Sequence, residues 1–515
     1  MRRFTGNTER LITRPGSTAI LAVKTITNAW HGQVVLGRGN GNKKVKEKIM
    51  AYELDIFDDP TLDAGFVRWL VEQQWPQSAA RFNRLWDYYA NTAAETPAAS
   101  DTSRGYIQAQ ELGLPARITG KTDSGARRKE VVIENDIAWR VNAMVDFLFG
   151  KPITIQSTAA SDDRRKDIES ILKAVFDANG GAVFFQDLAV LGAVYGFVDC
   201  IVRTSGSLAA RLANFTSDGT SPITPPLTVD SILRAAGEIS LEPIDAPRAL
   251  PVLEETDYKR MAAYVQHFHQ LCNRPDDNDS FITKLFGGPA AGSQRKTIAV
   301  TEILAADAWQ RYEDGHLAAE GVNPLGRVPV VHIPNLPQPG YYEGISDVEQ
   351  LLPLQDELNT RLSDRASRIT MQSFKMYLAK GLDGMDGRPI SPGQIWCSDN
   401  PDATIESFGG DAASPSEDLH IAEVREAMDK VSGVTPVVAG VLKNKLGNLS
   451  SAVALKMTFM GMLSKTYRKQ LTYGQGIKDI CKMTLELLDK ANIFKTDLNE
   501  RDTEIIFPSP IEEAI

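Results

Sequence analysis

The sequence predicts an α+β protein, and three observations support this fold class. Apolar residues recur every three to four positions in some segments, as in amphipathic helices, and alternate with polar residues in others, as in strands. The chain has 515 residues, enough for about two to four domains. Of these residues 43% are apolar and 24% are charged, which is an ordinary globular composition. Disordered, collagenous and fibrous proteins are thereby excluded.

Hydropathy and cysteine usage exclude further classes. No run of about eighteen uncharged apolar residues occurs, so the sequence predicts no membrane-spanning helix and no membrane partner. The cysteines Cys200, Cys272, Cys397 and Cys481 lie far apart and form no CxxC pair. This spacing predicts neither a zinc site nor a disulfide framework, and it favours a reducing compartment.

Charge is distributed unevenly along a chain whose formal net charge is -10. Residues 1–49 carry ten bases and two acids, whereas residues 343–429 carry 17 acids and 7 bases. Residues 430–478 carry eight bases and no acid. At the chain's average of 66 acids in 515 residues, a segment of that length would hold about six. The acid-free run is therefore a marked feature.

Residues 1–49 differ in texture from the rest of the chain. They mix Thr, Gly, Asn and Arg without helical or strand period, and they lack the apolar core of a signal peptide. The sequence becomes acidic and aromatic at Met50. Two interpretations stay open: a disordered basic arm, or a segment upstream of a true start at Met50. Residues 46–49 can be encoded by bases that resemble a ribosome-binding site, which slightly favours the second.

Helices and strands are both predicted in the first half of the chain. The predicted elements are helices over 132–149 and 184–195 and strands over 153–155 and 197–203. Gly150 and Pro152 form a helix stop after the first helix. Between residues 203 and 323, Ser/Thr/Pro-rich and Gly-rich loops separate short candidates whose topology the sequence does not give.

The second half is dominated by three predicted helices. The predicted elements are a helix over 344–373, strands over 374–378, 394–397 and 404–408, a helix over 414–432, and a long helix from Ser450 towards Leu488. Residues 346–349 fit a capping box, and Pro415 suits a first helical position. Pro353 should bend or restart the first of these helices. Gly461, Gly474 and Gly476 should interrupt the last one.

The two helices that bracket the strands each carry one apolar stripe, expected to pack. The residues are Val348, Leu352, Leu358, Leu362 and Ile369 in the first helix, and Ile421, Val424, Met428 and Val431 in the second.

Motifs for catalysis are missing from the sequence. The stretch PARITGKT at residues 115–122 resembles a phosphate-binding loop, but Pro115 stands where that loop needs Gly. Proline has no N–H to offer a phosphate, and no apolar strand precedes it. The glycine-rich stretch at residues 37–41 also lacks a preceding strand. The sequence therefore predicts that this is not an enzyme, with no catalytic residue.

Metal and cofactor motifs are missing as well. His267 and His269 flank Phe268 without the partners of a zinc motif. The aspartates at residues 276–279 lack the glycine of a calcium-binding loop. We therefore expect neither a metal nor a cofactor.

Four segments of the chain resemble a known family. They are LFGKPITI (148–155), VPVVHIPN (328–335), GISDVEQLLPLQDELNTRLSDRASRI (344–369) and GNLSSAVALK (447–456). In sequence, order and spacing they closely resemble portal proteins of tailed bacteriophages, the siphophage type. The resemblance covers residues from about 134 to 490, and no counterpart of residues 1–49 is recognised.

The resemblance implies a function. Portal proteins form a ring of twelve subunits at one capsid vertex, the channel for packaging and ejection of double-stranded DNA. The implied partners are further copies of the chain, the terminase large subunit, the major capsid and scaffolding proteins, and a head-tail adaptor. The implied location is the virion, after assembly in the host cytoplasm.

The resemblance also implies a division of the subunit. The expected parts are a wing at 50–343, stem helices at 344–373 and 414–432, a clip containing β structure at 374–413, a tunnel loop at 433–449, and a long kinked helix with wing return and helical crown in 450–515.

Several residues are candidates for contact with DNA. In the tunnel loop these are Lys443, Asn444, Lys445 and Asn448, and in the long helix Lys456 and Lys465. A DNA channel should avoid base-specific contacts and deep phosphate traps, and a few lysines in an otherwise acidic wall suit weak, repeated phosphate contacts.

Two other classes remain open. One is a different ring-forming head-tail connector or scaffold component of the virion, although such proteins are usually much shorter. The other is a nucleotide-driven packaging enzyme, which would need the intact phosphate-binding loop that this sequence lacks.

Overall fold

The computed structural model describes residues 52–59, 62–90, 132–213, 228–272, 296–373, 376–380, 401–408, 415–436 and 457–509. The expectations for residues 1–49, 115–122, 276–279, 394–397 and 437–456 lie outside this part of the chain. The chain divides into two units between Ile49 and Met50, and all of the described residues belong to the second unit.

The first described helices are continuous with one another. They are α1 (Ala64–Trp69), a π-helical turn (Leu70–Gln74) and α2 (Trp75–Ala90). The side chain of Asp63 caps α1 by accepting a 2.7 Å hydrogen bond from the Phe66 backbone N–H.

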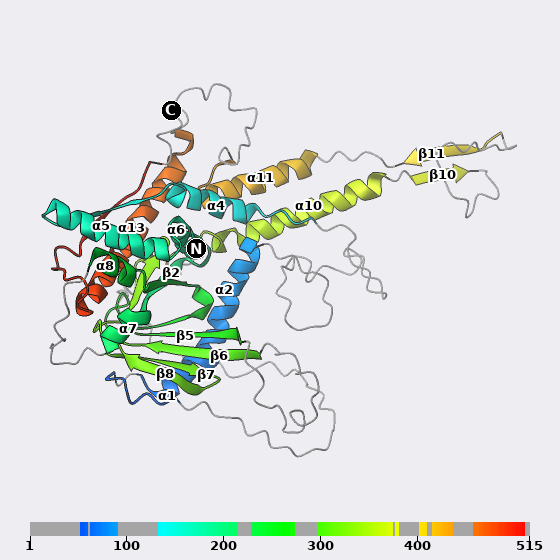
Figure 1. Ribbon diagram of the computed structural model, residues 1–515. Coiled ribbons are helices and arrows are strands. Elements are labelled where there is room, and N and C mark those ends of the chain that lie inside the picture. Colours follow the sequence, from blue (N-terminus) through cyan, green and yellow to red (C-terminus); the bar gives the residue numbers. More distant parts are fainter. Residues whose placement is uncertain are drawn as a thin grey trace, which may run out of the picture. The chain divides into compact units, whose positions relative to one another are not determined.

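Three helices and two small ones surround the main core (Figure 1). They are α4 (Asp136–Phe149), α5 (Asp162–Ala178), α6 (Ala182–Tyr195), α7 (Gly206–Ala213) and α8 (Val229–Ala236). The predicted helix over 132–149 begins four residues late, because Asn135 caps α4 by accepting from the Ala138 N–H at 3.0 Å. The predicted helix over 184–195 matches α6 within two residues.

A three-stranded antiparallel sheet lies at the centre of that core. Its strands β2 (Phe197–Thr204), β3 (Ile239–Ile244) and β9 (Val330–Pro334) are ordered β3-β2-β9. The first six residues of β2 are buried, which explains why it reads as an almost continuous apolar run. The predicted strand over 197–203 is confirmed.

A five-stranded antiparallel meander makes a second layer with a core of its own. Its strands in order are β4 (Ala249–Leu253), β5 (Met261–Cys272), β6 (Lys296–Leu304), β7 (Ala308–Glu313) and β8 (His316–Val322). A short 3-10 turn, Ala246–Arg248, precedes it. Apolar side chains from residues 52–70 pack on this sheet. The sequence did not reveal this topology.

A pair of helices with a β ribbon between them follows β9. A 3-10 turn (Glu349–Leu351) leads into α10 (Leu352–Ser373), and α11 (Pro415–Ser432) packs along α10 (Figure 1). Pro353 lies in the first turn of α10, so the restart at this proline is confirmed. Strands β10 (Met376–Lys380) and β11 (Thr404–Phe408) pair antiparallel; they correspond to the predicted strands over 374–378 and 404–408, the first shifted by two residues.

The chain ends with a long helix and a strand that returns to the first half. Helix α13 (Met460–Lys490) is followed by β12 (Thr503–Ile506), which pairs antiparallel with β1 (Thr154–Ser157). The predicted strand over 153–155 is thus shifted by one residue. Residues 491–509 form turns and β12, with no helix after α13 among the described residues.

Two of the three expected interruptions of the long helix, those at Gly474 and Gly476, are wrong. Helix α13 runs without a break through Gly474 and Gly476, whereas a turn at Phe459, two residues before Gly461, interrupts the helix predicted from Ser450. A Cβ atom at Gly476 would lie 2.4 Å from Ile333 Cγ1, so this glycine allows close packing of α13 on β9. Among the described residues, no helix is both long and apolar enough to span a membrane.

Candidate functional site

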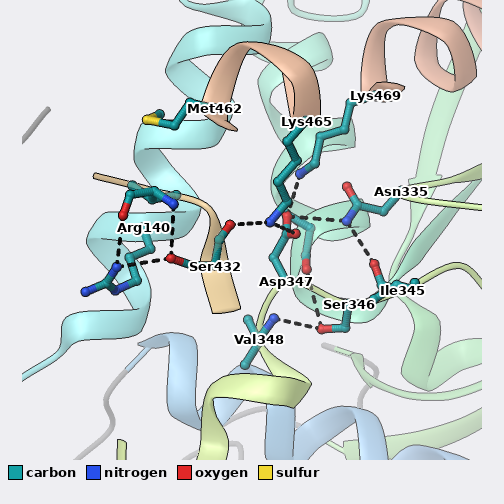
Figure 2. Close-up of polar contacts among 12 residues, drawn as sticks. Arg140, Asn335, Ile345, Ser346, Asp347, Val348, Ser432, Met462, Lys465 and Lys469 are labelled. Atoms are coloured by element: carbon teal, nitrogen blue, oxygen red, sulfur yellow. Dashed lines mark hydrogen bonds and ion pairs between the residues drawn. The ribbon is translucent and has the colours of Figure 1, made fainter. Parts of the chain in front are cut away.

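The entrance to α10 and the exit from α11 meet α4 and α13 at a buried junction of charged groups. Asp347, just before α10, is the centre of this junction (Figure 2). Its two carboxylate oxygens face two lysines of α13, at 2.8 Å from Lys465 Nζ and 2.5 Å from Lys469 Nζ. Asn335 Nδ2, which follows β9, also donates to Asp347 Oδ2 at 3.3 Å.

The electrostatics of Asp347 follow from this setting. Burial would raise the pKa of the Asp347 carboxyl, but the ammonium groups of Lys469 and Lys465 outweigh burial and lower it from the usual 3.8 to about 2. Burial also lowers the pKa of Lys469, against the opposing attraction of Asp347. Asp347 is therefore a stable carboxylate that holds two cations.

Lys465 links the two helices of the pair. Besides its contact with Asp347, its Nζ donates to the backbone carbonyl of Ser432 at 2.7 Å (Figure 2). Ser432 is the last residue of α11, whose terminal carbonyls have no partner within the helix. One cation of α13 thus holds both the start of α10 and the end of α11.

Arg140 of α4 holds the same helix end from the other side. Its guanidinium donates to Ser432 Oγ at 3.0 Å and to the Val434 carbonyl at 3.3 Å (Figure 2). It also forms ion pairs with Asp136 at 3.2 Å and Asp429 at 2.7 Å. Arg140 is buried, and the planar guanidinium suits several acceptors at once.

Apolar packing closes the junction beneath these charges. Ala143 and Met144 of α4, Val434 after α11, and Met462 of α13 form a small buried cluster. Gly433 ends α11 with a φ of 69°, a conformation that glycine adopts freely. The end of α11 and the start of α13 therefore lie next to each other in this cluster.

Backbone anchors fix the loop that leads from β9 to Asp347. Asn335 Nδ2 donates to the Ile345 carbonyl at 3.0 Å, and Ser346 Oγ donates to the Val194 carbonyl at 2.6 Å. Ser346 Oγ also accepts from the Val348 N–H at 3.0 Å, which provides the N-cap predicted for this residue.

A row of polar side chains on α10 holds the extended residues before α4. The backbone N–H groups of Val132 and Glu134 donate to Ser363 Oγ and Asn359 Oδ1, each at 3.0 Å. Gln355 Nε2 donates to the Glu134 carbonyl at 2.6 Å. The spacing of these α10 residues, four apart, puts them on one face of the helix.

Most of the residues expected to pack the helix pair are buried. They are Val348, Leu352, Leu358, Leu362, Ile421, Val424 and Met428. The prediction that Ile369 and Val431 pack in this way is wrong, because 46% and 44% of their surfaces are exposed. Ile369 lies near the end of α10, and Val431 turns away from the buried stripe of α11.

Of the residues expected to contact DNA, the structure describes Lys465 alone. Lys443, Asn444, Lys445, Asn448 and Lys456 lie outside the described residues. Lys465 is a correction, because its ammonium group points into the junction towards Asp347 and Ser432 instead of towards DNA.

Sequence reasoning missed Asp347, Lys469 and Arg140 as a cluster. A signal did exist for Lys469, which occupies the core-facing stripe of α13 between Met462 and Tyr473. A lysine at such a position requires a buried acidic partner. Nothing in the sequence identifies that partner, which lies 122 residues away.

The contacts in this junction hold helices together. It holds ion pairs and hydrogen bonds but no nucleophile next to a base. His267, one of the two histidines that flank Phe268, instead contacts Thr301 Oγ1 at 2.8 Å and stacks edge-on against Trp75. In the part of the chain that the structure describes, no three His, Cys, Asp or Glu residues gather in a way that could hold a metal ion.

The family model described as "Phage portal protein, SPP1 Gp6-like" matches residues 70–511. The comparison with curated proteins gives no match.

Two solved structures are similar to the chain at low identity. One is titled "Virion of native gene transfer agent (GTA) particle", with 11% identity, a TM-score of 0.38, and coverage of 72% of this chain and 79% of that one. The other is titled "Neck of empty GTA particle computed with C6 symmetry", with 12% identity, a TM-score of 0.39, and coverage of 72% and 80%. The family match, which spans most of the sequence, is decisive: the chain belongs to the SPP1 Gp6-like family of phage portal proteins.

Proposed function

We propose that twelve copies of this chain form a ring at one capsid vertex, and that double-stranded DNA passes along its axis during packaging and ejection. The observation that carries this proposal is the family match over residues 70–511. The helix pair with a β ribbon between its helices supports a division into stem and clip. In this assignment α10 and α11 are the stem helices, and β10 and β11 belong to the clip.

The buried junction has a defined task in this proposal. It holds the end of α11 and the start of α13 together through Lys465 and Ser432, so the segment between them leaves and returns at a fixed base. That segment contains Lys443 and Lys445, which we propose contact passing phosphates.

The charge distribution suits a channel. Residues 343–429, with 17 acids and 7 bases, would repel phosphates along the stem and clip. Two lysines per subunit, repeated around a ring, give many weak contacts without a strong one that would stop DNA movement.

We further propose that the energy for DNA movement comes from the terminase large subunit, which docks on the ring. The other proposed partners are the major capsid and scaffolding proteins and a head-tail adaptor. The proposal predicts no ATP hydrolysis by the purified protein. ATP turnover that disappears in a Lys121→Ala variant would contradict this.

Electron microscopy and native mass spectrometry of the purified protein test the proposal directly. We expect rings with twelve-fold symmetry and an axial hole, and a mass of twelve subunits. A protein that stays monomeric under all assembly conditions, or forms open filaments, would contradict the proposed ring.

A packaging assay tests the role of the lysines. The variant with both Lys443→Ala and Lys445→Ala should form normal rings but package or retain less DNA, and the defect should vary with ionic strength because exposed charges are screened. A variant with Lys166→Ala and Lys173→Ala, two exposed lysines of α5, is the control. Packaging at the control level across a salt series would exclude the loop from DNA contact.

A further inference from the structure

Helix α13 has two apolar faces, only one of which packs in the subunit. Its core face includes Met462, Tyr473, Ile477 and Ile480, all fully buried. On the opposite face Met460, Tyr467 and Leu471 are 60%, 55% and 76% exposed. A helix at the surface of a single subunit would normally carry polar residues on that face.

The exposed residues form a continuous stripe. Met460, Ser464, Tyr467 and Leu471 follow one another at spacings of four, three and four. This spacing is the one by which a helix presents a seam to another helix. A row of large apolar side chains in water marks an interaction surface.

Positive charge accompanies this stripe. Arg468 is exposed and flanks it, and no acidic residue occurs between positions 457 and 478. Among the described residues, no salt bridge to Arg468 is found. The outward face of α13, defined by Met460, Tyr467, Arg468 and Leu471, is therefore apolar and basic.

Helix α11 carries a surface of opposite charge. Its buried stripe is Ile421, Val424 and Met428, and the line on the other side is Leu419, Glu423 and Glu426. Leu419 is 61% exposed, and Glu423 has no salt bridge within the described residues. Glu426 pairs only with its helix neighbour Lys430, at 3.1 Å. The outward face of α11, defined by Leu419, Glu423, Glu426 and Lys430, therefore carries one net negative charge and an apolar anchor.

We infer that, in the ring, the outward face of α13 docks on the outward face of α11 of the neighbouring copy. This inference rests on the proposed function and specifies its subunit contact. Two different and complementary patches on one chain give a head-to-tail contact, and such contacts generate closed rings when the rotation closes. Their opposite charges also disfavour pairing of like faces.

An apolar-to-acidic substitution tests the α13 side. Leu471→Asp changes an exposed residue, so the subunit should keep its circular dichroism spectrum and melting temperature. The ring fraction in native mass spectrometry should fall by about tenfold or more, because every interface of the ring carries the change. The matched control is Val183→Asp, at an exposed valine in the first turn of α6, which should leave rings intact.

A charge exchange tests the commitment to α11. Arg468→Glu and Glu423→Arg should each reduce the ring fraction, and the two together should restore it. Unaffected rings in the single variants, or no recovery in the double variant, would overturn the pairing of these faces. Failure of the wild-type chain to form any ring would instead overturn the proposed function, so the two failures are distinguishable.

Discussion

The two ends of the α10–α11 pair differ in how far their ion pairs are exposed to solvent. At the base, Asp347 and Lys469 are buried, and Lys465 is nearly so. At the far end, Arg365 pairs with Asp418 at 3.0 Å and the Asp418 side chain is 65% exposed, whereas the neighbouring pair of Arg368 and Glu417 is more buried. The chain therefore places similar ion pairs in two very different environments.

This difference indicates that the helix pair is held mainly at its base. A buried charge that loses its partner is left without water, whereas an exposed one is rehydrated. The base also joins four elements, because Asp347, Ser432, Arg140 and the α13 lysines are linked through shared contacts. We therefore expect changes at the base to be severe and changes at the far end to be mild.

The largest effect is expected for an acid placed in the buried stripe. Leu358→Asp removes a fully buried side chain and leaves an unpaired carboxylate in the core, so it should lower the free energy of unfolding by about 4 kcal/mol or more. Urea unfolding of the purified variant measures this.

The matched control lies on the same helix. Ile369→Asp alters a residue that is 46% exposed, and it should change the free energy of unfolding by less than about 1 kcal/mol. Equal losses in the two variants would show that positions 358 and 369 are equally buried in the purified protein.

The next largest effect is expected at Asp347. Asp347→Asn keeps the shape of the side chain but leaves Lys469 buried without its counter-charge, so unfolding should become easier by about 3 kcal/mol. Stability in urea should fall, and the double variant with Lys469→Met should recover part of the loss. A fully stable single variant would mean that water reaches the junction.

Low pH should weaken the ion pairs that Asp347 forms with Lys465 and Lys469. The folded-state pKa of Asp347, about 2, lies below its usual 3.8, so its contribution is present above that usual value and is lost as the pH falls towards 2. The loss should be on the order of 2 kcal/mol. The wild-type and Asp347→Asn proteins should therefore converge in stability over this interval. Parallel curves of stability against pH would contradict the assignment.

Local signals made part of this molecule predictable from sequence. Helix α11 and strand β11 have the bounds expected within one residue, because caps, proline and apolar spacing are local features. The restart at Pro353 and the capping role of Ser346 were local in the same sense.

Non-local pairing explains what the sequence did not reveal. The order of β4 to β8 depends on strands brought together across loops, and the role of Lys465 depends on an acid 118 positions earlier. The glycines of α13 were misinterpreted because Gly476 serves contact with Ile333, which no spacing within the helix records. The basic run thus serves partly to neutralise the acidic segment before it.

The smallest effect is expected at the far end, and it completes the comparison. Arg365→Ala and Asp418→Ala, made singly and together, should give a coupling energy of about 0–1 kcal/mol, because both side chains reach solvent and rehydrate when parted. The coupling should shrink further at high salt, since an exposed pair is screened. Equilibrium unfolding of the four proteins provides the measurement. A coupling as large as the loss in Asp347→Asn would mean that this end is also buried, by neighbouring copies in the ring, and that burial within one subunit understates the rigidity of the whole helix pair.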